Sequence, residues 1–172
     1  MAMELISTIS YNHSVNELAC PKQDIFEFYS GNPKNTIGEL VCHKSEMQFR
    51  PDYNGQTLAI DYLETTVHNQ GDGTRIIKFA QDYSKKTGCN GYIVLKADPS
   101  IDVERIPHVF YRKMGFTTQN KKMDKKLDRL IKHNKSAKFG DFPSKLMVFP
   151  PPAENKLNIF KNFFSKLRKI FI

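Results

Sequence analysis

The middle of the chain has a hydrophobic pattern that few folds can accommodate. Residues 56–67 are strand-like, and residues 92–95 are a short continuous apolar run, which is typical of a buried parallel strand. Residues 73–88 between them carry apolar side chains at helical spacing. Pro107 then opens a second helix that ends at Gly115. A strand, glycine loop, helix, strand and helix in this order predict a right-handed parallel crossover in an α/β domain.

Weaker signals surround this unit. A turn cluster at Asp52–Gly55 predicts a hairpin before the strand at residues 56–67. The further strands that we expect are Glu4–Ile9, Thr36–His43, Glu46–Arg50 and Lys145–Phe149, and the further helices are Gln23–Tyr29 and a Lys-rich segment over Lys121–Lys138.

Length and charge set the domain organisation. With 172 residues the chain is long enough for one domain, and we expect residues 1–149 to form it, with a basic helical insertion at about residues 117–140. Residues 117–172 carry 14 Lys or Arg and 4 Asp or Glu residues, a sum of +10, whereas residues 1–116 sum to −2, so the net charge of +8 belongs to the last third of the chain. Residues 150–172 read as a proline-rich linker followed by a basic helix.

The cysteines and the N-terminus favour a cytoplasmic protein. The three cysteines have no CxxC spacing, which predicts reduced thiols and argues against a zinc site. No apolar run reaches the roughly 18 residues that a membrane span needs, and the first residues lack the form of a secretory signal. No spacing of His, Cys and Asp predicts a metal site, so we expect none.

Two glycines, Gly71 and Gly73, lie between the first strand of the central unit and its helix. The start of a helix leaves backbone N–H groups unpaired and favours anions, and glycine lets a phosphate approach the backbone. The loop therefore predicts a phosphate-containing ligand, although a plain tight turn explains such a pattern about as well. The spacing excludes a P-loop, and Ile76 stands where a dinucleotide fingerprint has its third glycine.

Two segments resemble motifs of the GNAT acetyltransferase superfamily. Residues His68–Gly73 are similar to its acetyl-CoA loop, Gln/Arg-x-x-Gly-x-Gly/Ala, with His68 in the first position. Residues Phe110–Phe116, FYRKMGF, are similar to its FYxKxGF motif. The resemblance covers residues 56–116 and implies a GNAT fold: an α/β (α+β) protein with a central mixed twisted sheet, a splayed strand pair and flanking helices, to which this chain adds a C-terminal amphipathic helix.

The resemblance departs from the family pattern at two places. A second register, Gln70–Arg75, restores the glutamine of the loop motif but puts Arg75 where a small residue belongs and shortens the helix, so we prefer the first register. The asparagine that is common at the start of the family's fourth helix is missing, and Glu104 stands near that place.

The resemblance also implies a cofactor and its site. Acetyl-CoA would be the co-substrate, with its pantetheine arm paired to backbone near Leu63, Glu64 and Thr65. Its pyrophosphate would contact the loop residues His68, Asn69, Gln70, Gly71, Asp72, Gly73 and Thr74.

Acyl transfer to an amine needs a proton acceptor for the amine and a donor for the leaving thiolate. The resemblance places Tyr111 near the sulfur as this donor, while a core tyrosine is the alternative. Glu64 and Asp61 are candidates for the base, with water as a third. Their odd spacing predicts that they face opposite sides of the sheet. His68 and His108 are more simply explained as structural or surface residues.

Residues 154–172 have apolar side chains at intervals of three and four, surrounded by Lys and Arg. This pattern predicts a basic amphipathic helix, of a type that lies on anionic membranes. Docking on its own domain, or in a homodimer, is the alternative, and nucleic acid is the least favoured partner because the aromatic residues lie on the apolar stripe.

Taken together, the sequence predicts an acyl-CoA-dependent N-acetyltransferase that acts on a primary amine, small or protein-borne. The localisation expected is cytoplasmic, with a peripheral position at the inner membrane surface if the tail binds lipid. The alternative is a non-catalytic CoA-binding or interaction protein, tethered through its C-terminal helix. A third reading, a basic nucleic-acid-associated protein, has no recognised motif.

Overall fold

The computed structural model describes residues 9–30, 35–49, 53–67, 70–100, 106–135 and 140–150. The strands are β1 (Ile9–Asn16), β2 (Gln23–Ser30), β3 (Thr36–Ser45), β4 (Thr57–Thr65), β5 (Ile93–Ala97) and β6 (Lys145–Phe149). The helices are α1 (Asp72–Lys86), α2 (Pro107–Lys113) and α3 (Lys121–Lys132). Among these described helices, none is long and apolar enough to cross a membrane.

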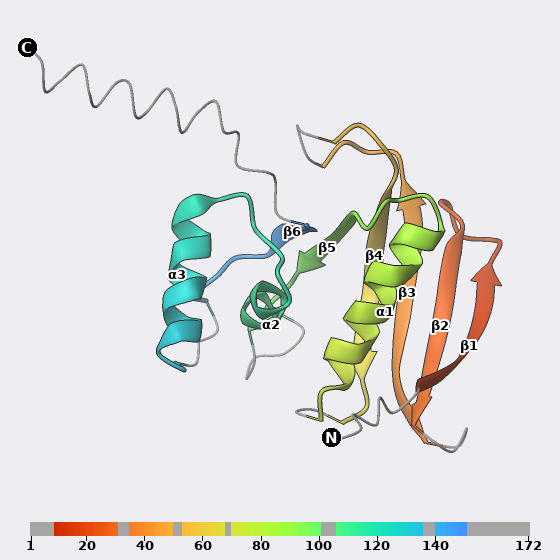
Figure 1. The fold of residues 1–172 in the computed structure, drawn as a ribbon, viewed down its shortest axis with the longest axis horizontal. Coiled ribbons are helices and arrows are strands. Elements are labelled where there is room, and N and C mark those ends of the chain that lie inside the picture. Colours follow the sequence, from red (N-terminus) through yellow and green to blue (C-terminus); the bar gives the residue numbers. More distant parts are fainter. Residues whose placement is uncertain are drawn as a thin grey trace, which may run out of the picture.

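The strands form one mixed sheet whose order follows the chain from β1 to β6 (Figure 1). Neighbouring strands from β1 to β4 are antiparallel, β4 and β5 are parallel, and β5 and β6 are antiparallel. α1 connects the two parallel strands and lies across β3 and β4, while α2 and α3 pack together beside β5 and β6 (Figure 1). The predicted βαβα unit and the α/β class are therefore confirmed at the level of a mixed sheet with helices.

The main hydrophobic core lies between the helices and one face of the sheet. Fully buried side chains come from the strands and from α1 and α3, and include Phe26, Phe28, Leu58, Ile76 and Leu127. Each such side chain contributes about 1.5–3 kcal/mol by leaving water. The sheet face opposite the helices, the open face, carries a smaller buried cluster of Ala59, Val94 and Val148.

The prediction of a helix over Gln23–Tyr29 is wrong, because these residues belong to β2. Phe26 and Phe28 are 1% and 0% exposed, whereas Glu27 between them is exposed. This alternation has the period of a strand. These residues form a strand because they pair with β1 on one side and with β3 on the other. The sequence of Gln23–Tyr29 alone does not indicate these pairings.

The predicted strand over Glu46–Arg50 is also wrong. The described part of it, Glu46–Phe49, forms no strand, and β3 itself pairs with β4. The described residues between β3 and β4, 46–49 and 53–56, thus belong to no strand or helix, and Phe49 among them packs against the small cluster on the open face.

The remaining predicted elements agree with the structure within a few residues, where it describes them. The Lys-rich helix begins at Lys121 and ends at Lys132, earlier than predicted. The predicted strand Glu4–Ile9 lies outside the described residues except for Ile9, which begins β1. The C-terminal helix of residues 154–172 lies outside them entirely, so its structure and the domain boundary stay predictions. The three cysteines form no disulfide.

Gly38 in β3 is packed tightly against β4 and α1. A Cβ atom at Gly38 would lie 2.3 Å from the backbone oxygen of Glu64 and 2.7 Å from Cδ1 of Ile76. Gly38→Ala should therefore lower the free energy of unfolding by about 1–3 kcal/mol, the usual cost of overpacking. Urea denaturation measures this loss, with Lys44→Ala, at an exposed position of the same strand, as a control that should change stability by less than about 0.5 kcal/mol. Equal stabilities of the two variants would contradict the close approach of β3, β4 and α1.

Candidate functional site

The parallel pairing of β4 and β5 stops early. Only three residue pairs are in register: Leu58 with Ile93, Ala59 with Val94, and Ile60 with Leu95. β4 nevertheless continues to Thr65, still paired with β3, while β5 continues to Ala97, paired with β6. Beyond Ile60 the two strands therefore separate, and an edge of β4 faces a gap in the middle of the sheet.

The direction in which the backbone N–H and C=O groups of β4 point follows from one hydrogen bond. The N–H of Thr66 donates to the carbonyl of Ile37 at 3.0 Å, so Thr66 points towards β3. Backbone groups alternate in direction along a strand, so Leu63 and Thr65 point the other way, towards the gap. They lie beyond the last residue of β4 that pairs with β5. An extended ligand could pair with these N–H and C=O groups as an added strand does.

The start of α1 lies at the same end of β4. Gly71 is the N-cap residue with φ of +83°, and no described side chain caps the helix. The first N–H groups of α1, on Asp72, Gly73 and Thr74, thus lack a side-chain acceptor, and the positive end of the helix dipole lies there. Gly71 has no heavy atom within 4 Å of the place where a Cβ would stand, so the backbone is open to an approaching group.

Gly73 has a different role from Gly71. A Cβ atom at Gly73 would lie 3.1 Å from Cζ of Phe110 and 3.7 Å from Cγ2 of Thr65. A small residue at this position lets α2 approach the start of α1.

The structure describes only some of the other residues of the predicted acetyl-CoA loop. His68 and Asn69 lie outside the described residues, and Gln70 is exposed. The Asp72 side chain is only 5% exposed and pairs with Arg75, at 3.2 Å between Oδ1 and Nη1. This pairing offsets the negative charge of Asp72 beside the uncapped amides, so the start of α1 stays compatible with an anion.

Tyr111 lies on α2, which packs against β5. Its ring is half-buried between Phe110 and Phe116, with centroid distances of 5.2 Å and 5.8 Å. Burial raises the pKa of Tyr111 to about 12, so its phenol stays protonated at neutral pH. Its hydroxyl forms no hydrogen bond with any described residue, which leaves the proton available for donation to a ligand.

The two candidate bases lie on the same face of the sheet, which corrects the prediction that they face opposite sides. The register shifts between Val41 and Cys42 of β3, where Asp61 is an extra residue in β4. Such a bulge adds one residue and cancels the odd spacing between Asp61 and Glu64. Both side chains then project from the open face, whereas Leu63 packs against the main core.

Asp61 and Glu64 have different surroundings. The Asp61 carboxylate accepts a hydrogen bond from Nε2 of Gln23 at 2.9 Å and lies 2.7 Å from Nδ1 of His43. These partners belong to β2 and β3, so they hold Asp61 away from β5. Glu64 accepts a hydrogen bond from the Tyr62 hydroxyl, which raises the pKa of Tyr62, and remains exposed. The arrangement favours Glu64 over Asp61 as a base at the gap.

Glu64 also belongs to a row of carboxylates that the sequence analysis missed. Glu27 of β2 is the direct cross-strand partner of Glu39 of β3, which is in turn the partner of Glu64. Like charges directly opposite one another are destabilising. The only Lys or Arg of β1 to β4 is Lys44, which alternates onto the other face, so this row gives the open face a negative field.

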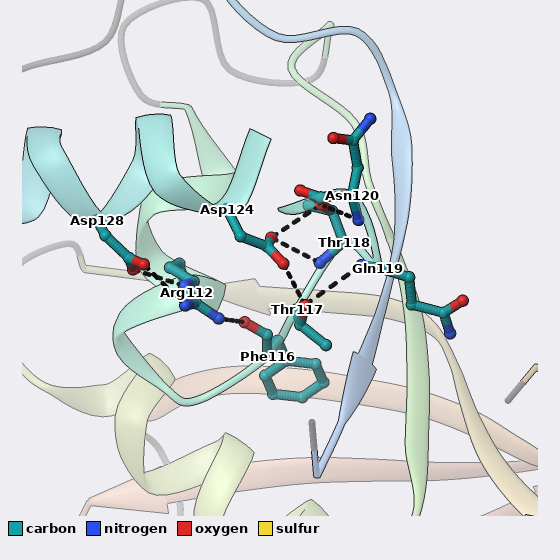
Figure 2. A network of polar contacts seen from close by, with 8 residues as sticks. All are labelled: Arg112, Phe116, Thr117, Thr118, Gln119, Asn120, Asp124 and Asp128. Atoms are coloured by element: carbon teal, nitrogen blue, oxygen red, sulfur yellow. Dashed lines mark hydrogen bonds and ion pairs between the residues drawn. The ribbon is translucent and has the colours of Figure 1, made fainter. Parts of the chain in front are cut away.

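The FYRKMGF segment is fixed by ion pairs and hydrogen bonds to α3 (Figure 2). Nε and Nη2 of Arg112 donate to the two carboxylate oxygens of Asp128 at 2.7 Å and 2.9 Å, and Nη1 donates to the carbonyl of Phe116. The buried carboxylate of Asp124 accepts from the hydroxyls of Thr117 and Thr118. These contacts tie α2 to α3 and so help to hold Tyr111 in place.

His108 is a core residue of this region and has no access to a ligand. It is 0% exposed, and its Nε2–H donates to the carbonyl of Pro143 at 3.0 Å. In the neutral ring Nδ1 is therefore unprotonated, and it has no hydrogen-bond partner among the residues that the structure describes. Burial lowers the pKa of His108, although the Pro143 hydrogen bond and the charge of Asp98 partly oppose this effect. The structural interpretation of His108 is thus the better one.

Comparisons with known proteins add no family. No protein-family model matches the chain, and no curated protein matches it. A functional interpretation therefore rests on the motifs in the sequence and on the geometry described above.

The buried neutral state of His108 predicts a pH dependence of stability. Its folded-state pKa lies below the unfolded value of about 6.5, so the unfolded chain takes up a proton first as the pH falls. Above about pH 6.5 the free energy of unfolding should therefore not depend on the protonation of His108. Below it, the free energy of unfolding should fall by up to about 1.4 kcal/mol for each pH unit.

Urea denaturation at several pH values, with wild type and His108→Gln compared, measures this effect. The difference in unfolding free energy between the two proteins should shrink as the pH falls below about 6.5. A difference that stays constant with pH would show that His108 is not held neutral.

Proposed function

We propose that the chain is an acyltransferase with a GNAT fold, which binds acetyl-CoA between β4 and β5 and transfers the acyl group to a primary amine. The observation that carries this proposal is the early end of the β4–β5 pairing. It leaves the backbone of Leu63 and Thr65 facing a gap, at the same end of β4 as the uncapped start of α1. Extended pantetheine suits the first feature, and a pyrophosphate suits the second.

Glu64, on the open face, and Tyr111, on α2 at the other face of the sheet, supply the two groups that direct attack of an amine needs in our scheme. The amine nitrogen bonds to the thioester carbonyl carbon as the carbon–sulfur bond breaks, and the amine loses a proton. Glu64, or a water beside it, accepts that proton in our scheme, and the Tyr111 hydroxyl donates to the departing sulfur. The raised pKa of Tyr111 suits a donor rather than a base. The row formed by Glu27, Glu39 and Glu64 supports a positively charged acceptor.

Two measurements test the proposal as a whole. Calorimetry with acetyl-CoA measures binding, and release of the CoA thiol in the presence of a panel of amines measures transfer. Binding with transfer supports the acyltransferase. Binding without transfer to any amine would favour the non-catalytic CoA-binding protein, and lack of binding would refute both.

Gly71 and Gly88 form a matched pair for testing the phosphate site. Both have positive φ, +83° and +90°, and open space around the missing Cβ, but they lie at opposite ends of α1. Alanine at either position brings a similar backbone strain of about 1–2 kcal/mol. We expect Gly71→Ala to weaken acetyl-CoA binding at least about tenfold, because its Cβ would stand where the phosphate approaches the backbone.

Calorimetry on the two folded variants makes the comparison, and Gly88→Ala should bind acetyl-CoA as the wild type does. Equal affinities of Gly71→Ala and Gly88→Ala would remove the start of α1 from the site. Gly73 is unsuitable for this test, because a side chain there would collide with Phe110.

Removal of the Tyr111 hydroxyl tests the proposed chemistry. Tyr111→Phe should lower kcat by about 10-fold to 1,000-fold while acetyl-CoA affinity stays within about twofold, because the lost group acts mainly in the transition state. Tyr83→Phe, on α1, serves as the control and should retain kcat. Wild-type kcat in Tyr111→Phe would make Tyr111 a packing residue.

A further inference from the structure

The outer surface of α3 is strongly positive and lies apart from the β4–β5 gap. The exposed basic residues of this surface belong to α3, except for Lys145 of β6. Lys126 of α3 pairs with Asp141 and is left out, and none of the others forms an ion pair with a described residue. We call this surface the α3 basic face, and it consists of Lys121, Lys122, Lys125, Arg129, Lys132 and Lys145. Over the 12 residues of α3 it extends for about 18 Å.

Both acidic residues of α3 are used internally, so they do little to neutralise this face. Asp124 is 8% exposed and accepts hydrogen bonds from Thr117 and Thr118, while Asp128 is bound by both arms of Arg112 (Figure 2). The hydrogen bonds from Arg112, helped by its charge, lower the pKa of Asp128. Asp124 is thus turned into the protein, and Asp128, although 52% exposed, has its charge neutralised by Arg112, while the basic side chains of the face are exposed.

A cleft of about 610 Å³ adjoins the start of α3. Lys121 and Lys145 line it from two different elements, and no described lining residue is acidic. Its walls also include Phe49, Val148 and Leu146, and Leu146 is 51% exposed. The cleft thus combines two unpaired amines with an accessible apolar side chain.

We propose that the α3 basic face, with this cleft, binds an anionic lipid surface. The negative surface potential of anionic lipids attracts positive side chains. Each such residue near the surface increases the partitioning of the protein onto the membrane about fivefold. The cleft places two amines beside apolar groups, as a lipid headgroup and the start of its acyl chains require. The acidic row on β2, β3 and β4 lies towards the other end of the sheet order, and its repulsion from the same lipids orients the protein.

A lipid surface suits this face better than a nucleic acid. Nucleic-acid surfaces that bind single strands combine positive charge with aromatic rings that stack on bases, and the α3 sequence contains no aromatic residue. The chain also continues from β6, one strand of this same region, into residues 154–172 with their apolar stripe and basic flanks. Stable membrane association commonly needs two such signals together.

Sedimentation with vesicles tests the proposal on the full chain. Wild type should bind phosphatidylcholine vesicles that contain phosphatidylglycerol and ignore pure phosphatidylcholine vesicles, with binding that weakens as salt is added. Lys122→Glu with Lys125→Glu should lower partitioning at least about 25-fold, from two factors of about five. Glutamate near the start of a helix favours the dipole, so α3 should stay folded.

Lys78→Glu with Lys86→Glu is the matched control, because both residues are exposed on α1 and the change in net charge is the same. This control should partition within about threefold of the wild type, since its charges lie outside the proposed face. If the α3 variant does not fold, as judged by thermal melting, Lys122→Gln with Lys125→Gln replaces it, with an expected loss of about 25-fold.

Three results would overturn the proposal. The first is equal partitioning of the α3 variant and the α1 control, which would assign binding to the tail or to net charge. The second is a wild-type protein that does not bind the anionic vesicles. The third is a wild-type protein that binds a DNA or RNA duplex and ignores the vesicles.

Discussion

The short pairing of β4 with β5 is the constraint on which the candidate site depends. β4 leaves β5 after three residue pairs, while β4 stays paired with β3 and β5 with β6. Beyond Ile60 the β5 side of β4 has no strand partner among the described residues, whereas an ordinary ladder would continue. α1 begins at the same end of β4, so these strand amides and the helix amides that no described side chain caps lie close together in the chain.

The bulge at Asp61 decides that the carboxylates of Asp61 and Glu64 lie on the same face of the sheet. Without the extra residue, Asp61 and Glu64 would alternate onto opposite faces. With it, Asp61 bonds with Gln23 and lies beside His43, and Glu64 remains exposed at the end of a carboxylate row. The cross-strand repulsion in this row lowers the stability of the fold, so we expect the row to have a function on the open face that compensates for this loss.

Charge divides the molecule along the sheet. The open face of β2 to β4 is negative, whereas α3 and β6 present amines that lack ion-pair partners among the described residues. The same Arg112–Asp128 ion pair that neutralises the charge of Asp128 on α3 also helps to hold the FYRKMGF segment in position. Positioning of the candidate site and the positive character of α3 therefore have a common structural origin.

The sequence by itself determined the features whose signals are local. The order of the central strands and helices, the glycines at both ends of α1 and the start of α2 at Pro107 follow from periodicity, capping and backbone preference, and all are present in the structure. The tyrosine of the motif and the loop glycines were also visible there, although their role in binding stays a proposal.

Only the tertiary structure decided β2, the bulge at Asp61, the row of Glu27, Glu39 and Glu64, and the burial of His108. Each of these depends on hydrogen bonds or contacts between residues far apart in the chain. Local preference cannot report such partners, because the register between two strands is set by the sheet as a whole.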